Sequence, residues 1–259
     1  MIQQTTLITG ASSGIGLEMA LIFAKKGNNI VLTARNHTKL KELQMQIKQN
    51  FKVNVWVFPI DLSHQSAAKE LYDEIKKNKI AITQLVNNAG FGDYGNFYKL
   101  SIEKANAMMQ LNMISLVNLT YYFVKDMKDN NYGKILNTAS ILSFFPMPRF
   151  SVYAATKSFV LSFSEALSRE LKKTNISVTC LCPGPTKSNF TQHSEMNKSF
   201  AYNKLKQAVA KDVAKYGIRA MEKGKRTAIY GLKNKIIVFL TRLGTRSFVL
   251  KIANFISSK

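Results

Sequence analysis

Short runs of apolar residues alternate along this chain with longer stretches in which apolar residues recur every three or four positions. Continuous apolar runs are typical of strands buried on both faces, and the three-to-four spacing is typical of amphipathic helices. The expected strands are 5–8, 30–33, 53–58, 84–87, 134–137, 176–181 and 227–230. The expected helices are 17–24, 38–50, 66–77, 102–128, 153–173 and 208–223.

This alternation predicts one α/β domain over residues 1–259, with a doubly wound parallel sheet and helices on both faces. A chain of 259 residues, 46% of them hydrophobic, is long enough to bury one large core, and no linker or repeat divides it. In such a fold, ligands bind beyond the carboxyl ends of the strands, near the point where the strand order reverses. The residues that follow each strand are therefore the candidates for chemistry.

A glycine-rich turn, residues 9–16 (TGASSGIG), follows the first expected strand. A strand, a glycine turn and a helix start place a dinucleotide pyrophosphate at the helix N-terminus, where free N–H groups and the helix dipole favour an anion. Gly10 permits the tight turn, Gly14 lets the backbone approach the phosphate, and Gly16 lets the helix pack closely on the sheet. Ser12, Ser13 and Ile15 belong to the same expected site. An ordinary strand-to-helix turn is the alternative.

Arg35 follows the second strand, at a place where an acidic residue would favour NAD. A planar cation there suits the 2′-phosphate of NADP(H), and Lys39 and Lys41 add charge nearby. The alternative is a solvated arginine in a loop.

The next two strand ends offer contacts for the rest of the nucleotide. Asp61 and Leu62 follow the third strand and are expected at the adenine. Asn88, Ala89 and Gly90 follow the fourth, and they are small and polar enough for a ribose to lie close to the backbone.

Ser140 follows the fifth strand, and Tyr153 and Lys157 lie four residues apart on the helix that comes next. They share a helix face, and a nearby ammonium lowers the pKa of a tyrosine from about 10 toward the range useful for proton transfer. Three other Tyr/Lys pairs have the same spacing. Tyr153 differs from them by its place between the strand ends at Ser140 and at Pro183-Gly184.

Taken together, these motifs resemble the short-chain dehydrogenase/reductase family, whose fold is Rossmann-like. The matching residues occur in the family's order over most of the first 190 residues: 9–16, 87–90, Asn112, Ser140, Tyr153 with Lys157, and Pro183-Gly184 followed by Thr186. The resemblance implies an NADP-dependent oxidoreductase that transfers a hydride between NADPH and a carbonyl, without a metal. It also implies a homodimer or homotetramer built through the helices that begin near Ile102 and Tyr153.

The resemblance also implies a role for each matching residue. Tyr153 is the general acid/base, Ser140 holds the carbonyl oxygen, and Lys157 binds the nicotinamide ribose and lowers the pKa of Tyr153. Asn112 holds a water that continues the proton relay. Pro183, Gly184 and Thr186 orient the nicotinamide carboxamide.

Four positions depart from the family's common residues, namely Ala139, Ser143, Thr156 and Ser188. We expect these departures to change the shape of the substrate pocket rather than the proton relay.

Apolar residues after Ser140 are expected to line that pocket. They are Ile141, Leu142, Phe144, Phe145, Met147 and Phe150, joined by Phe190 and Phe200 from a later stretch and by a wall at 91–95. An apolar lining favours a small lipophilic carbonyl substrate, such as a ketone or a 3-oxoacyl chain. Subunit packing is the alternative use of these aromatic residues. The long polar stretch 187–207 is expected to form a substrate lid.

The formal net charge of +22 is consistent with an anionic partner, and a codon bias toward lysine, asparagine and isoleucine is the alternative. The candidates are a phosphorylated cofactor, an acidic carrier protein that presents the substrate, and an anionic membrane; no motif indicates nucleic acid. The basic amphipathic tail 228–259 contains no acidic residue. It is expected either to lie on a membrane surface or to pack on the protein.

Cys180 and Cys182 are the only cysteines and sit in an apolar run, which predicts reduced core residues rather than a disulfide framework or a zinc site. With no signal segment or membrane span recognised, the expected location is the cytoplasm, with peripheral contact to the inner membrane surface as an extension. A non-catalytic NADP-binding regulatory or membrane-associated protein is the alternative function. Intact Ser140, Tyr153 and Lys157 favour an enzyme.

Overall fold

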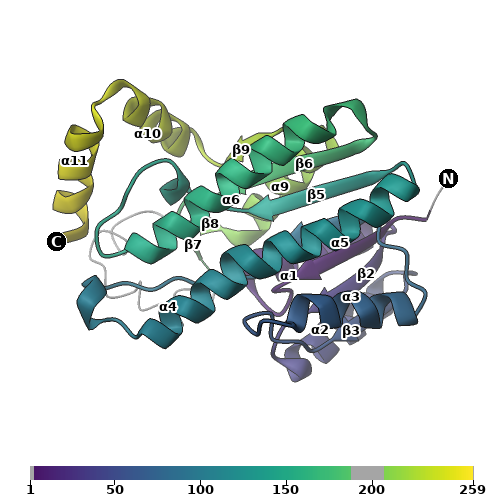
Figure 1. Cartoon of the computed structure of the whole chain (residues 1–259). Helices are drawn as coiled ribbons and strands as arrows, with labels where there is room; N and C mark the ends of the chain where they lie inside the picture. The colour runs from purple at the N-terminus through teal and green to yellow at the C-terminus, as the bar shows by residue number, and fades with distance from the viewer. Residues whose placement is uncertain (1–2, 188–206, 259) are drawn as a thin grey trace.

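A seven-stranded parallel sheet forms the centre of the protein, in the order β3-β2-β1-β4-β5-β6-β9 (Figure 1). The computed structural model describes residues 3–187 and 207–258. The strands are β1 (Thr5–Thr9), β2 (Asn29–Thr33), β3 (Val55–Phe58), β4 (Gln84–Asn87), β5 (Gly133–Thr138), β6 (Ile176–Cys182) and β9 (Thr227–Ile229). All neighbouring strands run parallel. The doubly wound parallel sheet expected from the sequence is confirmed.

Helices cover both faces of the sheet. One face carries α1 (Gly14–Lys25), α2 (His37–Asn50) and α9 (Ala210–Glu222), and the other carries α3 (Ala67–Lys77), α5 (Leu116–Asp129) and α6 (Ser151–Glu170). Successive strand residues point to opposite faces, so Leu7 enters one core and Ile8 the other, both with no exposed surface. Burial on both faces explains why the strands are continuous apolar runs.

The helix expected over 102–128 is interrupted. It consists of α4 (Ile102–Met109), a π-helical segment η2 (Gln110–Ser115) and α5. Asn112 lies in the π segment, and its amide donates to the backbone oxygen of Phe91 (3.0 Å) and to Oγ1 of Thr156 (3.1 Å). The apolar spacing along one helix does not encode these contacts with distant segments, and π turns often occur at functional sites.

Two short strands lie next to a part of the chain that falls outside the described residues. β7 (Thr186–Lys187) pairs with β8 (Ala208–Val209), so α9 begins two residues later than expected. Of the expected lid 187–207, only the two end residues are described. Ser188, Phe190 and Phe200 lie outside the described residues.

The remaining short elements are single 3₁₀ turns. They are η1 (Phe97–Lys99), η3 (Ile141–Ser143) and η4 (Leu171–Lys173).

The tail forms two helices, α10 (Leu232–Leu243) and α11 (Arg246–Ser258), along one edge of the molecule (Figure 1). Gly244 lies between them, as the sequence pattern indicates. The backbone oxygen of Ser257 accepts hydrogen bonds from the Tyr94 hydroxyl (3.0 Å) and from Nη1 of Arg149 (3.1 Å). These bonds anchor the end of α11 beside the start of α6.

The ends of β1 and β4 are tied together at the point where the strand order reverses. Oγ1 of Thr9 accepts hydrogen bonds from the N–H groups of Asn88 and Ala89, both at 2.9 Å. Nδ2 of Asn88 donates to the backbone oxygen of Thr9 (3.1 Å). The glycine turn after β1 is therefore fixed against the loop after β4.

Replacing Gly16 tests how closely this junction is packed. A Cβ there would overlap the backbone oxygen of Gly10 and Nδ2 of Asn88. We expect Gly16→Ala to lower the free energy of unfolding in urea by about 2 kcal/mol, more than alanine's gain in helix propensity. The control is Gly244→Ala, since Gly244 has an ordinary extended backbone and only side-chain neighbours. Equal stability of the two variants would contradict the close packing.

Candidate active site

A cleft of about 1750 Å³ runs along the carboxyl ends of the strands. The glycine turn and the end of β2 line one end, the ends of β4, β5 and β6 line the middle, and α10 and α11 line the other end. Most of the predicted site residues line this cleft: Gly10, Ser12, Ser13, Gly14, Ile15, Arg35, Asp61, Leu62, Asn88, Ala89, Gly90, Ser140, Tyr153, Lys157, Pro183, Gly184 and Thr186. Gly16 and Asn112 lie behind its wall.

The glycine turn has the geometry of an anion site. Gly10 (φ 66°) and Gly14 (φ 57°) adopt the left-handed backbone conformation that other residues rarely take. Ser13 is in an extended conformation at the N-cap of α1, its side chain makes no capping hydrogen bond, and the first turn contains no acidic residue. Such a helix N-terminus favours a bound anion.

Cations gather at the end of the cleft beyond β2. Arg35 and Lys39 are exposed and both line the cleft. Oδ1 of Asn36 accepts a hydrogen bond from the backbone N–H of Lys39 (2.9 Å), which caps α2 and fixes the loop between the two cations. A phosphate group on the ligand would meet two positive charges here.

The turn after β3 is also fixed. Oδ1 of Asp61 accepts hydrogen bonds from the N–H (3.0 Å) and the hydroxyl (2.7 Å) of Ser63. The backbone oxygen of Leu62 accepts a hydrogen bond from Ser115 (2.6 Å). Asp61 and Leu62 are therefore held at the cleft wall before any ligand arrives.

Two residues that line the cleft carry a buried hydroxyl oxygen without a partner. Oγ1 of Thr33 and Oγ1 of Thr138 have no hydrogen-bond partner within the described part of the structure, and the same is true of Oδ1 of Asn87 and Oγ1 of Thr179, which do not line the cleft. All four oxygens are too deeply buried to touch a ligand. The fit to a dinucleotide therefore rests on the left-handed glycines and on the N-terminus of α1, which no side chain caps.

Tyr153 and Lys157 lie one turn apart on α6 and both line the cleft. Nζ of Lys157 lies 5.9 Å from the centre of the Tyr153 ring and donates to the backbone oxygen of Thr138 (2.9 Å). Burial lowers the pKa of Lys157 to about 8, because the ammonium ion is removed from water. The nearby thiols of Cys180 and Cys182, both buried and free, partly oppose this shift.

Ser143 connects Ser140 to α6. Oγ of Ser143 accepts from the N–H of Ser140 (3.2 Å) and donates to the backbone oxygen of Lys157 (2.8 Å). Oγ of Ser140 accepts from the N–H of Leu142 (3.1 Å), so the turn is closed on both sides. Ser143 does not itself line the cleft; it lies behind the wall and positions two of the proposed catalytic residues, and its expected effect on the shape of the pocket stays a prediction.

Thr156 has a similar supporting place. Its hydroxyl donates to the backbone oxygen of Tyr153 (2.8 Å) and accepts from Nδ2 of Asn112. Oδ1 of Asn112 accepts from the N–H of Phe91 (3.2 Å), and its side chain is almost fully buried. The Asn112 side chain therefore joins α6 to the loop after β4, and its expected hold on a water stays a prediction.

The apolar end of the cleft is built from two parts of the chain. Five of the residues expected after Ser140 line it, namely Ile141, Leu142, Phe145, Met147 and Phe150. Phe144 instead packs against a core cluster beside α6. The other wall is not predicted by the sequence pattern; α10 and α11 supply it with Leu232, Ile237, Leu240, Phe248 and Ile252. The sequence shows the helical spacing of these residues, but it does not show that they cover the cleft.

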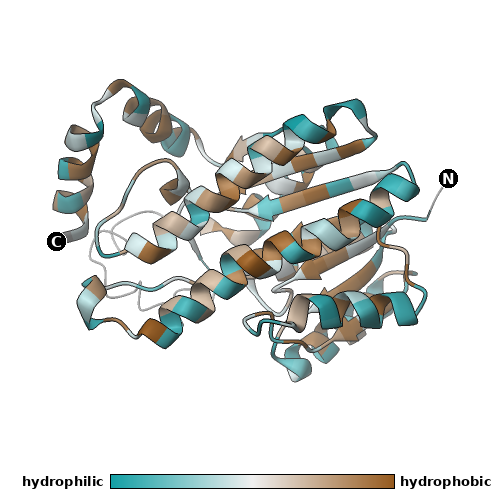
Figure 2. Ribbon diagram, in the orientation of Figure 1, coloured by the Kyte–Doolittle hydropathy of each residue, from teal (hydrophilic) through white to brown (hydrophobic). Residues whose placement is uncertain are grey.

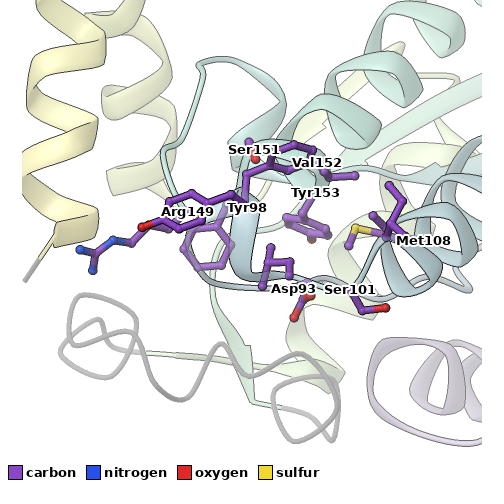
Figure 3. A pocket seen from close by; sticks show the side chains of 13 residues that line it. Asp93, Tyr98, Ser101, Met108, Arg149, Ser151, Val152 and Tyr153 are labelled. Atoms are coloured by element: carbon purple, nitrogen blue, oxygen red, sulfur yellow. The ribbon is translucent and has the colours of Figure 1, made fainter.

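A second cavity of about 210 Å³ lies on the other side of Tyr153 (Figure 3). Tyr98, Met108 and Arg149 are among its lining residues, and Asp93 at its wall pairs with Lys104 (2.7 Å). Figure 3 shows the Arg149 side chain pointing away from Tyr153 and toward α11. Tyr153 thus forms part of the wall between the two cavities.

Comparison with known proteins gives consistent matches. A family model described as short chain dehydrogenase matches residues 4–199. A very-long-chain 3-oxoacyl-CoA reductase of Rattus norvegicus is 34% identical over 183 residues, covering 68% of this chain and 57% of the rat protein. An 11-beta-hydroxysteroid dehydrogenase of Pinus massoniana is 31% identical over 229 residues, covering 88% of this chain and 64% of the pine protein. The chain therefore spans about three-fifths of the length of these two relatives.

A solved structure shows the same fold. A short-chain dehydrogenase from Sphingobium yanoikuyae in complex with NADPH superposes with a TM-score of 0.82 at 27% identity. The match covers 94% of this chain and 95% of that one.

The low pKa of Lys157 predicts a particular pH dependence of stability. Between pH 8 and 10.5 the unfolded chain holds a proton on Lys157 that the folded chain has released, so this residue makes stability rise with pH. The variant Lys157→Met lacks this contribution. The measurement is the difference between the free energies of unfolding in urea of the wild type and of Lys157→Met. We expect this difference to be constant below pH 7 and to rise between pH 8 and 10 in favour of the wild type, by up to about 1.4 kcal/mol per pH unit. A constant difference over that range would exclude the depressed pKa.

Proposed function

The chain belongs to the short-chain dehydrogenase/reductase family of oxidoreductases, and we propose that it transfers a hydride between NADP(H) and the carbonyl of a lipophilic ketone or 3-oxoacyl substrate. One observation carries this proposal. Ser140, Tyr153 and Lys157 line the middle of a single cleft, between a cation-bearing nucleotide end and an apolar end.

The residues of the polar half would hold the cofactor. The glycine turn and the N-terminus of α1 would bind the pyrophosphate, and Arg35 with Lys39 the 2′-phosphate. The loop 88–90 would pack against the ribose, Lys157 would bond the nicotinamide ribose, and the segment 183–186 would meet the carboxamide. When bound, NADPH supplies the hydride that reduces the carbonyl carbon.

Side chains of the protein would supply the proton and stabilise the charge that its transfer leaves behind. Tyr153 gives its phenolic proton to the carbonyl oxygen, which becomes the alcohol hydroxyl once the carbon has received the hydride. The Ser140 hydroxyl donates a hydrogen bond to the same oxygen and holds it in place. Lys157, with a pKa of about 8, is mostly protonated at neutral pH, and its positive charge stabilises the phenolate left on Tyr153. In alcohol oxidation the same groups act in reverse.

The apolar half of the cleft supports a lipophilic substrate. Aliphatic and aromatic side chains from the segment after Ser140 face those of α10 and α11. A wall of this kind binds hydrocarbon and offers a polar sugar few hydrogen bonds. The rat and pine relatives are named for a very-long-chain 3-oxoacyl-CoA and an 11-beta-hydroxysteroid, and both names denote largely apolar molecules.

Tyr153→Phe removes the proposed proton donor and leaves the ring in place. We expect NADPH oxidation to fall at least about 10³-fold with a bulky ketone and with a 3-oxoacyl thioester, free or on an acidic carrier protein. NADPH binding, followed by fluorescence titration, should change by less than about threefold because the phenol oxygen contributes little to it. Undiminished turnover in this variant would exclude Tyr153 as the donor, and turnover of polar sugars alone would exclude the substrate class.

Arg35→Asp tests the phosphate contact. We expect the affinity for NADPH to fall by at least about tenfold, because a charge-assisted bond to the 2′-phosphate becomes a repulsion, and the affinity for NADH to change by less than about threefold. The matched control is Lys48→Asp, which makes the same charge change on an exposed residue at the far end of α2. Equal losses for the two cofactors would contradict the assignment of Arg35.

A further inference from the structure

The tail helices expose an unusual amount of apolar surface. Within α10 and α11, eleven large apolar side chains are more than 40% exposed, over a stretch of only 25 residues: Leu232, Ile236, Ile237, Phe239, Leu240, Leu243, Phe248, Leu250, Ile252, Phe255 and Ile256. Figure 2 shows brown, hydrophobic segments along both helices at the edge of the molecule. Concentrated exposure of this kind marks an interaction surface.

Helical geometry gathers these side chains into one stripe on each helix. Leu232, Ile236, Phe239 and Leu243 recur at steps of three and four residues, and so share one face of α10. Phe248, Ile252 and Phe255 do the same on α11. The buried residues Val238, Ala253 and Ser257 lie on the opposite faces, against the protein. We call the two exposed stripes together the tail surface.

Positive charges flank the tail surface. Lys233, Lys235 and Arg242 on α10 and Arg246 and Lys251 on α11 are all exposed. The segment 228–259 contains no acidic residue. An apolar stripe bordered by lysine and arginine matches the boundary between anionic lipid headgroups and acyl chains.

A second copy of the chain would fit this surface poorly. In a two-fold interface a patch meets a second copy of itself, so the five flanking cations of each copy would be brought into one interface with no acid in the segment to neutralise them. Like charges brought together in an apolar contact oppose association. An anionic lipid surface supplies the missing negative charge instead.

The cleft opens at the same place. Leu232, Leu240 and Leu243 are each more than half exposed and also line the cleft. The apolar end of the cleft is therefore continuous with the tail surface. Tyr94 and Arg149, by holding Ser257, keep α11 at this position.

No helix in the described residues has the length and apolar content needed to cross a bilayer.

We propose that the tail surface docks on anionic membranes, with the apolar side chains of α10 and α11 at the acyl boundary and their lysines and arginines on the headgroups. The opening of the cleft then faces the bilayer, where a lipophilic substrate is dissolved. This last consequence rests on the proposed function, whereas the docking itself rests on the two helices alone.

Vesicle binding without cofactor or substrate tests the docking. The full chain is sedimented with phosphatidylcholine vesicles that contain or lack phosphatidylglycerol, and we expect at least about tenfold stronger binding to the anionic vesicles. Phe239→Ser with Phe255→Ser should weaken that binding about tenfold or more, since two rings no longer enter the acyl boundary. Neither residue lines the cleft, so turnover of a soluble ketone should be unchanged.

A double variant at two equally exposed residues outside the tail helices is the control for loss of exposed apolar area. Met45 and Tyr121 are each 56% exposed, against 60% for Phe239 and 61% for Phe255, and lie on α2 and α5. Their replacement by serine should leave vesicle binding within about twofold of the wild type. An equal loss in both pairs would overturn the proposal.

Charge reversal separates local docking from attraction by the net charge of the whole chain. Lys235→Glu with Arg242→Glu should weaken binding to anionic vesicles at least about tenfold, and Lys211→Glu with Lys215→Glu on α9 much less. Equal losses would mean that net charge alone attracts the chain, and would refute the proposal. A second combination of results would also refute the proposal. In it, the wild type does not bind vesicles, and light scattering shows a dimer that the double variant Phe239→Ser with Phe255→Ser dissociates. If the chain does not bind vesicles but turns over its substrate, the docking proposal fails and the proposed reaction is unaffected. If the chain binds vesicles but has no turnover, the proposed reaction fails and the docking proposal is unaffected.

Discussion

The parallel direction of all seven central strands is the constraint on which the rest of this structure depends, because it brings their carboxyl ends to the same side of the sheet. At the junction of β1 and β4 the chain continues outward in two directions, and the hydrogen bonds from Asn88 and Ala89 to Thr9 hold the two ends together. The cleft follows from this arrangement. It collects a glycine turn, a serine and a tyrosine–lysine pair that are far apart in the sequence.

The middle of the cleft combines a buried charge with a closed hydrogen-bond network. The Lys157 ammonium group donates to the Thr138 carbonyl and is buried away from water. This burial lowers the pKa of Lys157 and opposes folding at neutral pH. Ser143 and Thr156 fix the backbone at Ser140, Lys157 and Tyr153 from behind the wall. A buried polar network in which the members bond one another gives a rigid arrangement, and the proposed chemistry needs fixed positions.

The two halves of the cleft differ in the chemistry of their walls. The half proposed to bind the nucleotide is made of backbone turns, small residues and two exposed cations, whereas the half proposed to bind the substrate is closed by apolar side chains of α10 and α11. The same two helices expose the apolar, cation-flanked surface proposed to meet a membrane. In these two proposals, one pair of helices connects the binding of an apolar substrate with the medium in which such a molecule is most soluble.

The sequence by itself determined the features that depend on local pattern: the alternation of strands and helices, the glycine turn, and the strand-end residues that parallel topology must bring together. The tertiary structure decided the rest. The π segment at Asn112, the supporting places of Ser143 and Thr156, and the position of α10 and α11 over the cleft depend on contacts between distant residues. Arg149 and Ser257, for example, lie 108 positions apart. Apolar spacing reveals which face of a helix is buried, but not which distant surface it meets, because that choice is made by packing and hydrogen bonding in the folded chain.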